Sequence, residues 1–373
     1  MHILNTLEGA GYEARLVGGC VRDTLMRRRP SDWDVATAAR PGEVERLFRR
    51  TVPTGARHGT VTVLYGGGHC EVTTYRTEGA YTDRRRPDSV SFTTSLEADL
   101  SRRDFTINAM AMDAAGRVTD PFGGRADLAR GLIRCVGSPE RRFSEDALRM
   151  FRALRFAARL GFEIDPGALS AIYSLAPLTA SLSAERVAGE VSAMLSSSRP
   201  DGAYLLADWG LLSGRALPGS GPPARALAPL PHYARLAHYC ASLEERGSIM
   251  STRGFLTALR FPARAIKTAS AAAEIILGQK RDYKRLLRDY GEDAVLAALP
   301  KSRALRAVLA CGECWSVKGL AVGGAELAAL GLRGREIGEA LDALLEHVID
   351  HPSDNRHDIL CQLIKERYGN DRA

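Results

Sequence analysis

Strand signals occur only in the first third of this chain, and helical signals fill the rest. In the first third, short runs rich in β-branched residues read as strands at 15–17, 32–36, 59–65 and 70–75. Gly66-Gly67-Gly68 separates the last two runs and predicts a hairpin. From Phe143 onward, apolar residues recur at helical spacing and strand signals vanish. The pattern therefore predicts an α+β head followed by an all-helical remainder.

Length and charge narrow the class of protein further. A chain of 373 residues favours two or more domains, and the Gly/Pro/Ala-rich stretch 214–231 is typical of a linker. Lys plus Arg outnumber Asp plus Glu by 51 to 44, mostly through Arg, which favours a polyanionic partner. No apolar run is long enough for a membrane span, and we expect no secretory signal. Seven scattered cysteines indicate reduced thiols and a cytoplasmic location.

A glycine pair links the first predicted strand to a helix. Gly18 and Gly19 lack side chains, so their backbone can approach a phosphate closely at the start of that helix. Arg22 follows one turn later, where its guanidinium is placed to hold a triphosphate.

Two carboxylates alternate in the next predicted strand. Residues i and i+2 of a strand face the same side, so Asp32 and Asp34 are expected side by side. Such a pair favours Mg²⁺, because the two charges repel each other unless a cation lies between them. Glu71, on a later strand, is a candidate third ligand. The order of glycines and carboxylates resembles polymerase-β-like nucleotidyltransferases, in which metal ions align a 3′-hydroxyl with an α-phosphate.

Four further motifs make the resemblance specific. They are Ser101-Arg-Arg-Asp-Phe-Thr-Ile-Asn-Ala-Met-Ala-Met112, Asp120-Pro-Phe-Gly-Gly124, Glu145-Asp-Ala-Leu-Arg-Met-Phe-Arg-Ala-Leu-Arg-Phe156 and Ala184-Glu-Arg-Val-Ala-Gly-Glu190. With the glycine and aspartate motif, this set resembles the class II tRNA nucleotidyltransferases, which are the CCA-adding enzymes and their bacterial poly(A) polymerase relatives. The motifs cover residues 16–190 in the family's order, and a weaker resemblance continues over 320–338.

The resemblance implies a domain plan and roles for individual residues. The plan is a catalytic head at 1–136, a base-recognising neck at 137–210, a helical body at 211–300 and a tRNA-binding helical tail at 301–373. The implied roles are triphosphate binding by Gly19 and Arg22, metal binding by Asp32 and Asp34, nucleotide binding by Arg103, and ribose selection by Asp104 and Asn108. Trp33 departs from the family's smaller residue, and we expect its side chain to point away from the metal face.

A polar stripe in the neck is suited to reading a base. Residues spaced by three on a helix, namely Asp146, Arg149, Arg152 and Arg155, lie opposite the apolar side formed by Met150, Phe151, Leu154 and Ala158. Asp146 accepts and Arg149 donates hydrogen bonds, which suits the amino group and ring nitrogen of both cytosine and adenine. Uracil and guanine present the reverse pattern of donor and acceptor. Each buried group that is left without a partner costs about 1–3 kcal/mol of binding free energy. Arg152 and Arg155 either support the pair or bind phosphate, and a solvated, salt-bridged face is the alternative.

Two segments bear on which member of the family this is. Residues 54–63 resemble the CCA-adding type, and 77–92 resembles the full-length flexible loop of CCA-adding and A-adding enzymes. We therefore expect addition of CCA to tRNA from CTP and ATP, with Mg²⁺ as cofactor and no protein partner implied. The alternatives are A-adding or CC-adding activity, poly(A) synthesis, and a non-catalytic RNA-binding protein.

Three smaller features have two interpretations each. Glu185 and Arg186 either support the base-reading helix or form a surface ion pair. The pairs Cys311/Cys314 and His347/His351 have spacings that metal ligands use, but packing cysteines and surface histidines are the favoured explanation, because no further ligand motif accompanies either pair. The helical C-terminal half is expected to contact tRNA phosphates.

Overall fold

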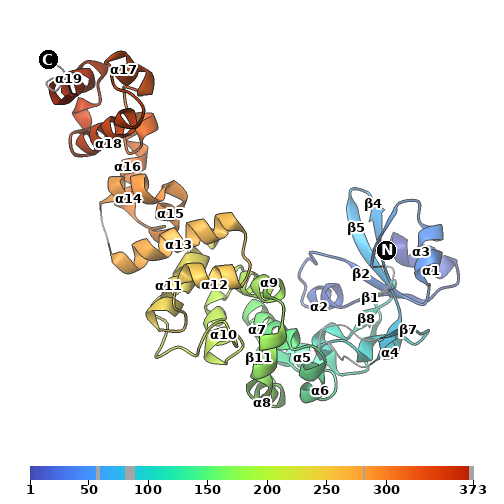
Figure 1. Cartoon of the computed structure of the whole chain (residues 1–373). Coiled ribbons are helices and arrows are strands. Elements are labelled where there is room, and N and C mark those ends of the chain that lie inside the picture. The colour runs from blue at the N-terminus through green and yellow to red at the C-terminus, as the bar shows by residue number, and fades with distance from the viewer. Residues whose placement is uncertain (56–58, 80–88, 280–281, 369–373) are drawn as a thin grey trace. The chain divides into compact units, whose positions relative to one another are not determined.

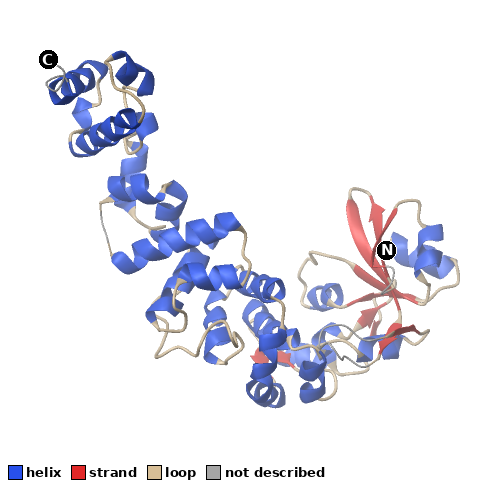
Figure 2. Ribbon diagram, in the orientation of Figure 1, coloured by secondary structure: helices blue, strands red, loops and turns tan. Residues whose placement is uncertain are grey.

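The computed structural model describes residues 1–55, 59–79, 89–279 and 282–368. The chain divides into two compact units, Met1–Gly219 and Ser220–Ala373. Figures 1 and 2 show that strands lie in the first unit and that the second is helical. The boundary falls within the predicted linker, where residues 213–231 form neither helix nor strand. The finer division into head, neck, body and tail stays a prediction.

A mixed sheet forms the framework of the first unit. Among the described residues its strand order is β3-β4-β5-β2-β1-β8-β9. These strands are β1 (Ala14–Val17), β2 (Asp34–Thr37), β3 (Thr51–Gly55), β4 (Thr60–Tyr65), β5 (Gly68–Thr74), β8 (Ala111–Met112) and β9 (Val118–Thr119). β2 and β5 are parallel, whereas the other neighbours are antiparallel. The parallel pairing places Asp34 opposite Glu71.

Alternation along the strands separates two apolar layers. Leu16 and Val35 belong to the larger core, which includes residues of α1 (His2–Gly9), α2 (Gly19–Leu25) and α3 (Pro41–Leu47). Their neighbours Val17 and Ala36 face the opposite side, together with Leu100 of α4 (Leu96–Ser101). This period of two fixes which face of the sheet carries Asp34.

Most predicted strands are confirmed, with two corrections. The hairpin of β4 and β5 turns at Gly66 and Gly67, whose φ angles of +48° and +83° favour glycine. Asp32, however, lies in a bend before β2 rather than in the strand. The prediction that strands end before Phe143 is also wrong, because β11 (Glu163–Ile164) pairs in parallel with β10 (Leu132–Ile133). Two-residue strands carry too little pattern to be detected in sequence.

The remaining elements of the first unit lie around the motif residues. A small hairpin joins β6 (Arg76–Glu78) to β7 (Val90–Phe92). The helices are α5 (Gly124–Arg130), α6 (Pro139–Glu145), α7 (Leu148–Leu160), α8 (Pro166–Leu175), α9 (Ala184–Leu195) and α10 (Leu205–Asp208). Short 3₁₀ helices cover Thr106–Asn108, Ala176–Ser181 and Pro200–Tyr204.

The expected single helix through residues 145–156 is divided in two. Asp146 has an extended backbone, with φ −146° and ψ 105°, and ends α6. One of its carboxylate oxygens then accepts the backbone N–H of Leu148 at 3.1 Å, so Asp146 caps the start of α7. Asp146 therefore does not share a helix with Arg149, Arg152 and Arg155. The predicted apolar side of α7 is confirmed, since Met150, Phe151, Leu154 and Ala158 are buried.

In the described ranges of the second unit, 220–279 and 282–368, helices alone make up the regular structure. They are α11 (His232–Glu245), α12 (Thr252–Ala258), α13 (Ala263–Gly278), α14 (Tyr283–Tyr290), α15 (Glu292–Ala298), α16 (Arg303–Ala310), α17 (Gly324–Ala329), α18 (Arg335–Asp350) and α19 (His357–Tyr368), with 3₁₀ turns at Val317–Gly319 and Pro352–Asp354. An apolar cluster that includes Leu327, Leu345 and Leu360 joins α17, α18 and α19. None of the helices in the described ranges has the length and apolar character of a membrane span.

A glycine at the start of α5 provides a test of the packing below the site. A Cβ atom on Gly124 would lie 2.8 Å from the backbone carbon of Thr106 and 2.9 Å from Cγ of Met110. We expect Gly124→Ala to lower the free energy of unfolding by about 1–3 kcal/mol, because backbone must move to make room. Urea unfolding followed by circular dichroism measures this loss.

Gly42 is the matched control for that substitution. It is exposed in α3, and a Cβ there would meet nothing within 4 Å. Gly42→Ala should leave stability unchanged or raise it by about 0.4–1 kcal/mol, because alanine restricts the unfolded chain. Equal losses in both variants would contradict the packing explanation.

Candidate active site

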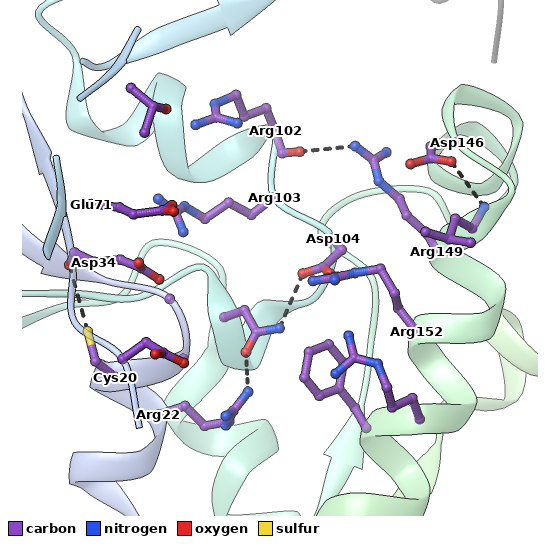
Figure 3. A pocket seen from close by; sticks show the side chains of 18 of the residues that line it. Cys20, Arg22, Asp34, Glu71, Arg102, Arg103, Asp104, Asp146, Arg149 and Arg152 are labelled. Atoms are coloured by element: carbon purple, nitrogen blue, oxygen red, sulfur yellow. Dashed lines mark hydrogen bonds and ion pairs between the residues drawn. The ribbon is translucent and has the colours of Figure 1, made fainter. Parts of the chain in front are cut away.

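The motif residues of the first unit line one cavity of about 890 Å³. Its walls come from β2, β5, the segment after α4 and α7, as Figure 3 shows. Among the described lining residues the basic side chains are all arginines, with no lysine: Arg22, Arg76, Arg102, Arg103, Arg149, Arg152, Arg155, Arg159 and Arg186. Arginine forms fork-shaped hydrogen bonds with phosphate oxygens, so the lining suits a polyphosphate.

Carboxylates gather at the β2 wall of this cavity. Asp32, Asp34 and Glu71 line it together. Burial, followed by the like charge of Glu71, raises the pKa of Asp34. Trp33, between the aspartates, lines a separate apolar pocket with Leu4 and Tyr65, so its side chain points away from the carboxylates as expected.

This donor set suits a divalent cation that is shared with a substrate. Among the described residues, no group of three or more Asp, Glu, His or Cys side chains is close enough to hold a metal alone. Mg²⁺ is commonly bound by one or two carboxylates plus substrate phosphates, and Asp32 and Asp34 supply that number. The pKa of Asp34 is raised by burial and by the like charges of Glu71 and Asp32, and the nearby charge of Arg103 offsets this only in part.

The glycine pair brings backbone close to two charged groups. Gly18 has φ +74°, and α2 begins at Gly19. A Cβ on Gly18 would lie 3.1 Å from Nη1 of Arg103 and 3.8 Å from Oδ2 of Asp34. The positive φ angle therefore favours glycine at position 18, and a Cβ there would also press on the guanidinium of Arg103.

Hydrogen bonds connect the head motifs to α7. Arg22 donates through Nη1 to Asn108 at 2.8 Å, and Asn108 donates to Asp104 at 3.2 Å. Asp104 in turn forms an ion pair with Arg152 at 2.7 Å. Burial acts to raise the pKa of Asp104, but Arg152 outweighs it and holds that pKa below its ordinary value. The guanidinium of Arg22 also pairs with Asp23 at 2.7 Å, and only 3% of the Arg22 side chain is exposed.

The two residues expected to read the base both line the cavity but have other partners. Asp146 accepts a hydrogen bond from Arg186 at 2.7 Å, and Arg149 pairs with Glu145 at 2.6 Å. The contact between Arg186 and Asp146 agrees with the interpretation in which Arg186 supports the base-reading segment.

Sequence reasoning missed Phe156, around which three of these arginines gather. Guanidinium carbons of Arg22, Arg152 and Arg155 lie 5.3, 5.4 and 4.6 Å from the centre of its ring. The ring also packs edge-on against Phe105 at 5.8 Å. Arg155 pairs with Glu190 at 2.6 Å, which links α7 to α9. The sequence shows Arg155 directly before Phe156. It does not show that arginines from two separate motifs come together at the ring of Phe156.

The remaining candidates contribute little to this cavity. Cys314 donates to the carbonyl of Ser316, and His347 pairs with Asp354 at 2.8 Å, so both have local partners. Residues 56–58 of the CCA-type segment and 80–88 of the predicted loop lie outside the described residues. What is described of the loop is its stem, β6 and β7.

Comparison with known proteins places this architecture in a family. Residues 14–134 match the model of the Poly A polymerase head domain, and 161–214 match the probable RNA and SrmB-binding site of polymerase A. The CCA-adding enzyme of Geobacillus kaustophilus is 42% identical over 322 residues, covering 83% of this chain and 77% of the relative. The enzyme of Lactiplantibacillus plantarum is 53% identical over 198 residues, covering 53% of this chain and 49% of the relative.

Solved structures agree with these matches. The crystal structure of Bacillus stearothermophilus CCA-adding enzyme in complex with CTP has a TM-score of 0.82 at 34% identity, covering 100% of this chain and 97% of the other. The Thermotoga maritima enzyme complexed with tRNA shares the fold, with a TM-score of 0.64 at 20% identity, covering 98% of this chain and 94% of the other.

The fold and the cavity therefore define a nucleotidyltransferase with a polymerase-β-like head. More particularly, the chain belongs to the family of CCA-adding enzymes. Nucleotidyltransferases of this family generally use divalent metal ions.

The charge of Asp34 should cost the free protein stability. Its raised pKa means that the folded state resists ionisation at this position, so the penalty is present above the folded pKa and disappears below the ordinary value of 3.8. We expect Asp34→Asn to raise Tm at pH 7.5 in EDTA, and the gain to shrink as the pH falls toward 4. Calorimetry over this pH range measures the effect.

Asp113 provides a control of opposite sign. Hydrogen bonds from the backbone and side chain of Arg117 lower the pKa of Asp113, so its contribution is present at neutral pH and lost in acid. Asp113→Asn should lower Tm at pH 7.5 and have less effect near pH 4. A lower Tm at neutral pH for Asp34→Asn would contradict the electrostatic interpretation of the site.

Proposed function

We propose that this protein adds C, C and A to the 3′ end of tRNA from CTP and ATP, with Mg²⁺ and without a nucleic-acid template. The observation that carries the proposal is the cavity itself. Asp32 and Asp34 lie on its β2 wall, Asp146 and Arg149 lie on its helical wall, and the other basic side chains around them are arginines. The family membership supports the same reaction. A cytoplasmic location is part of the proposal, supported by seven cysteines that are all free.

The reaction needs alignment and charge stabilisation more than covalent help from the protein. The oxygen of the tRNA 3′-hydroxyl bonds to the α-phosphorus as the bond from that phosphorus to the β-bridging oxygen breaks. Pyrophosphate leaves with the bonding electrons, and the hydroxyl proton is lost to solvent. Asp32 and Asp34 would hold the divalent cations, which would supply activation of the hydroxyl and neutralisation of phosphate charge. Arginines of the cavity hold the triphosphate. The negative charge of the triphosphate then balances part of the arginine charge that carboxylates balance in the free protein.

Base selection fits the contacts around Asp146. The hydrogen bonds from Leu148 and Arg186 use one lone pair on each carboxylate oxygen, and each oxygen retains another. The fixed carboxylate can therefore accept the amino group of cytosine or adenine. Arg149, held by Glu145, supplies the donor for the ring nitrogen. Because both partners are fixed before a nucleotide enters, a base with the reverse pattern leaves buried groups unsatisfied.

A-adding activity is the nearest alternative, because an A-adding enzyme uses ATP alone and adenine fits the same two residues, Asp146 and Arg149. Incubation with tRNA lacking its last three nucleotides distinguishes the two activities. CTP and ATP together should give complete CCA ends, as sequencing of the products will show. Failure to add C, with ready addition of A to a CC end, would assign the protein to the A-adding class.

Replacing either metal-binding carboxylate should stop the chemistry. Asp32→Asn and Asp34→Asn are each expected to abolish addition of C and A alike, because each removes a carboxylate ligand. Product length on labelled tRNA measures addition, and filter binding should show near-normal affinity for tRNA. Trp33→Phe, which alters the residue between them on the opposite face, should retain most activity. Substantial addition by either Asn variant would overturn the assignment.

Replacing Asp146 should relax base selection. Asp146→Ala removes the acceptor, so UTP and GTP incorporation should rise relative to CTP and ATP while correct addition falls. Ratios of kcat/KM for the four nucleotides measure this. Arg186→Met, the matched control, removes an anchor but leaves the carboxylate capped on Leu148, and should change selectivity less. A slower Asp146→Ala enzyme with unchanged preference would show that the residue only caps α7.

A further inference from the structure

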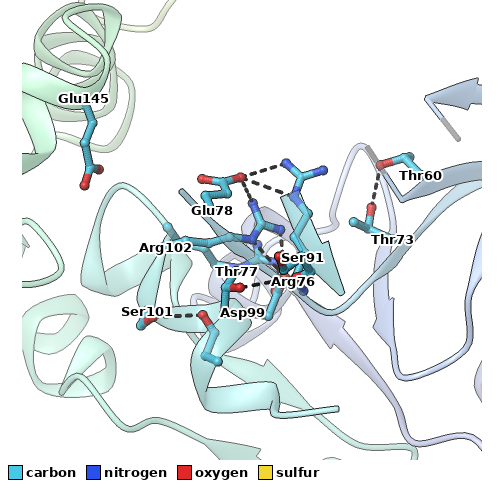
Figure 4. Close-up of polar contacts among 12 residues, drawn as sticks. Thr60, Thr73, Arg76, Thr77, Glu78, Ser91, Asp99, Ser101, Arg102 and Glu145 are labelled. Carbon is cyan, nitrogen blue, oxygen red and sulfur yellow. Dashed lines mark hydrogen bonds and ion pairs between the residues drawn. The ribbon is translucent and has the colours of Figure 1, made fainter. Parts of the chain in front are cut away.

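Asp99 is a buried carboxylate shared by three arginines. It lies in α4 with no exposed surface. Its Oδ1 accepts from Nε and Nη2 of Arg102, at 3.0 and 2.8 Å, and from the backbone N–H of Arg76 at 3.3 Å. Its Oδ2 accepts from Nη2 of Arg103 at 3.2 Å. Figure 4 shows the cluster formed by Asp99, Arg102, Arg76 and Glu78 beside the stem of the small hairpin.

Arg103 extends from Asp99 toward the metal-binding wall. Figure 3 shows its side chain reaching toward Asp34 and Glu71. A Cβ atom placed on Gly18 would lie 3.1 Å from Nη1 of Arg103 and 3.8 Å from Oδ2 of Asp34. The guanidinium and the carboxylate therefore both lie next to Gly18. Within the described chain, no hydrogen bond or ion pair joins Arg103 to either Asp34 or Glu71. Nε of Arg103 is buried and has no partner.

Two anionic centres thus compete for one guanidinium. Asp34 and Glu71 form one, and Asp99 forms the other. Only Asp99 has Arg103 in hydrogen-bond contact. An arginine paired directly with Asp34 would neutralise the carboxylate that a divalent cation needs, and its Nη1 and Nε would no longer be available to a triphosphate.

We propose that Asp99 is a positioning residue that holds Arg103 away from Asp34, which keeps Asp34 available to a divalent cation and Arg103 available to the nucleotide. The inference rests on the metal site of the proposed function. Asp99 acts through Arg103, because its carboxylate is fully buried among the arginines. Asparagine at this position supplies one acceptor oxygen and an NH₂ group that only donates, so it cannot accept from Arg102 on one atom and from Arg103 on the other as Asp99 does. The released guanidinium then pairs with Asp34.

Metal binding to the free protein tests this without turnover. Free Mn²⁺ is titrated by electron paramagnetic resonance in the absence of nucleotide and tRNA. We expect Asp99→Asn to weaken Mn²⁺ binding about tenfold, a size typical of changes beyond the metal ligands themselves. In an Arg103→Met background, Asp99→Asn should produce no further weakening, because the competing cation is absent.

Glu78→Gln is the matched control for loss of one negative charge. Glu78 is a buried carboxylate of the same cluster and pairs with Arg76 and Arg102, whereas Arg103 is held by Asp99. We expect Glu78→Gln to change Mn²⁺ affinity less than about twofold. Equal weakening by Glu78→Gln and Asp99→Asn would reduce the effect to general electrostatics and overturn the proposal.

The remaining outcomes separate this inference from the proposed function. Mn²⁺ binding that is lost in Asp34→Asn but unchanged in Asp99→Asn overturns only the role of Asp99. Binding that is unaffected by Asp34→Asn overturns the metal site as well. If Asp99→Asn does not fold, Asp99→Ser replaces it, because it also removes the carboxylate that holds Arg103. Unchanged Mn²⁺ affinity in that variant also overturns the proposal.

Discussion

Compensation of buried arginine charge is the constraint on which the first unit depends. Guanidinium groups surround a cavity that is suited to a polyphosphate, and they repel one another when no anion lies between them. Each main cluster therefore has its own carboxylate: Asp104 for Arg152, Glu190 for Arg155, and Asp99 for Arg102 and Arg103. Because Arg152 pairs with Asp104 and Arg155 pairs with Glu190, the requirement for charge balance also joins α7 to the segment after α4 and to α9.

Asp146 shows how one residue meets a structural and a chemical requirement together. It ends α6, caps α7 through Leu148 and accepts from Arg186. A carboxylate fixed by two hydrogen bonds has little freedom to adapt to the wrong base, and rigid polar partners are what make a mismatch costly. The division of the predicted helix at this point is therefore what presents the acceptor to the cavity.

Local patterns predicted the main strands of the head, the hairpin at Gly66 and Gly67, and the apolar side of α7, because each follows from residues near one another in the chain. The motifs also placed Asp34, Arg103 and Asp146 at one cavity. The partners of these residues were not predictable, since Asp146 meets Arg186 across 40 positions and Asp104 meets Arg152 across 48. The helix break was missed because an aspartate within a helical pattern can either continue the helix or cap the next one, and only tertiary contacts decide.

Exposure separates arginines that can change partners from arginines that cannot. Arg22 was expected to contact the triphosphate, yet it is nearly buried and donates to both Asp23 and Asn108. Arg152 is 35% exposed and is held by one carboxylate. Under the proposed function, an entering triphosphate would reach Arg152 at a lower cost in broken hydrogen bonds, while Arg22 would act on it through the chain of Asn108 and Asp104. A second criterion favours Arg103, because its buried Nε has no hydrogen-bond partner and, under the proposed function, would gain one from a phosphate oxygen.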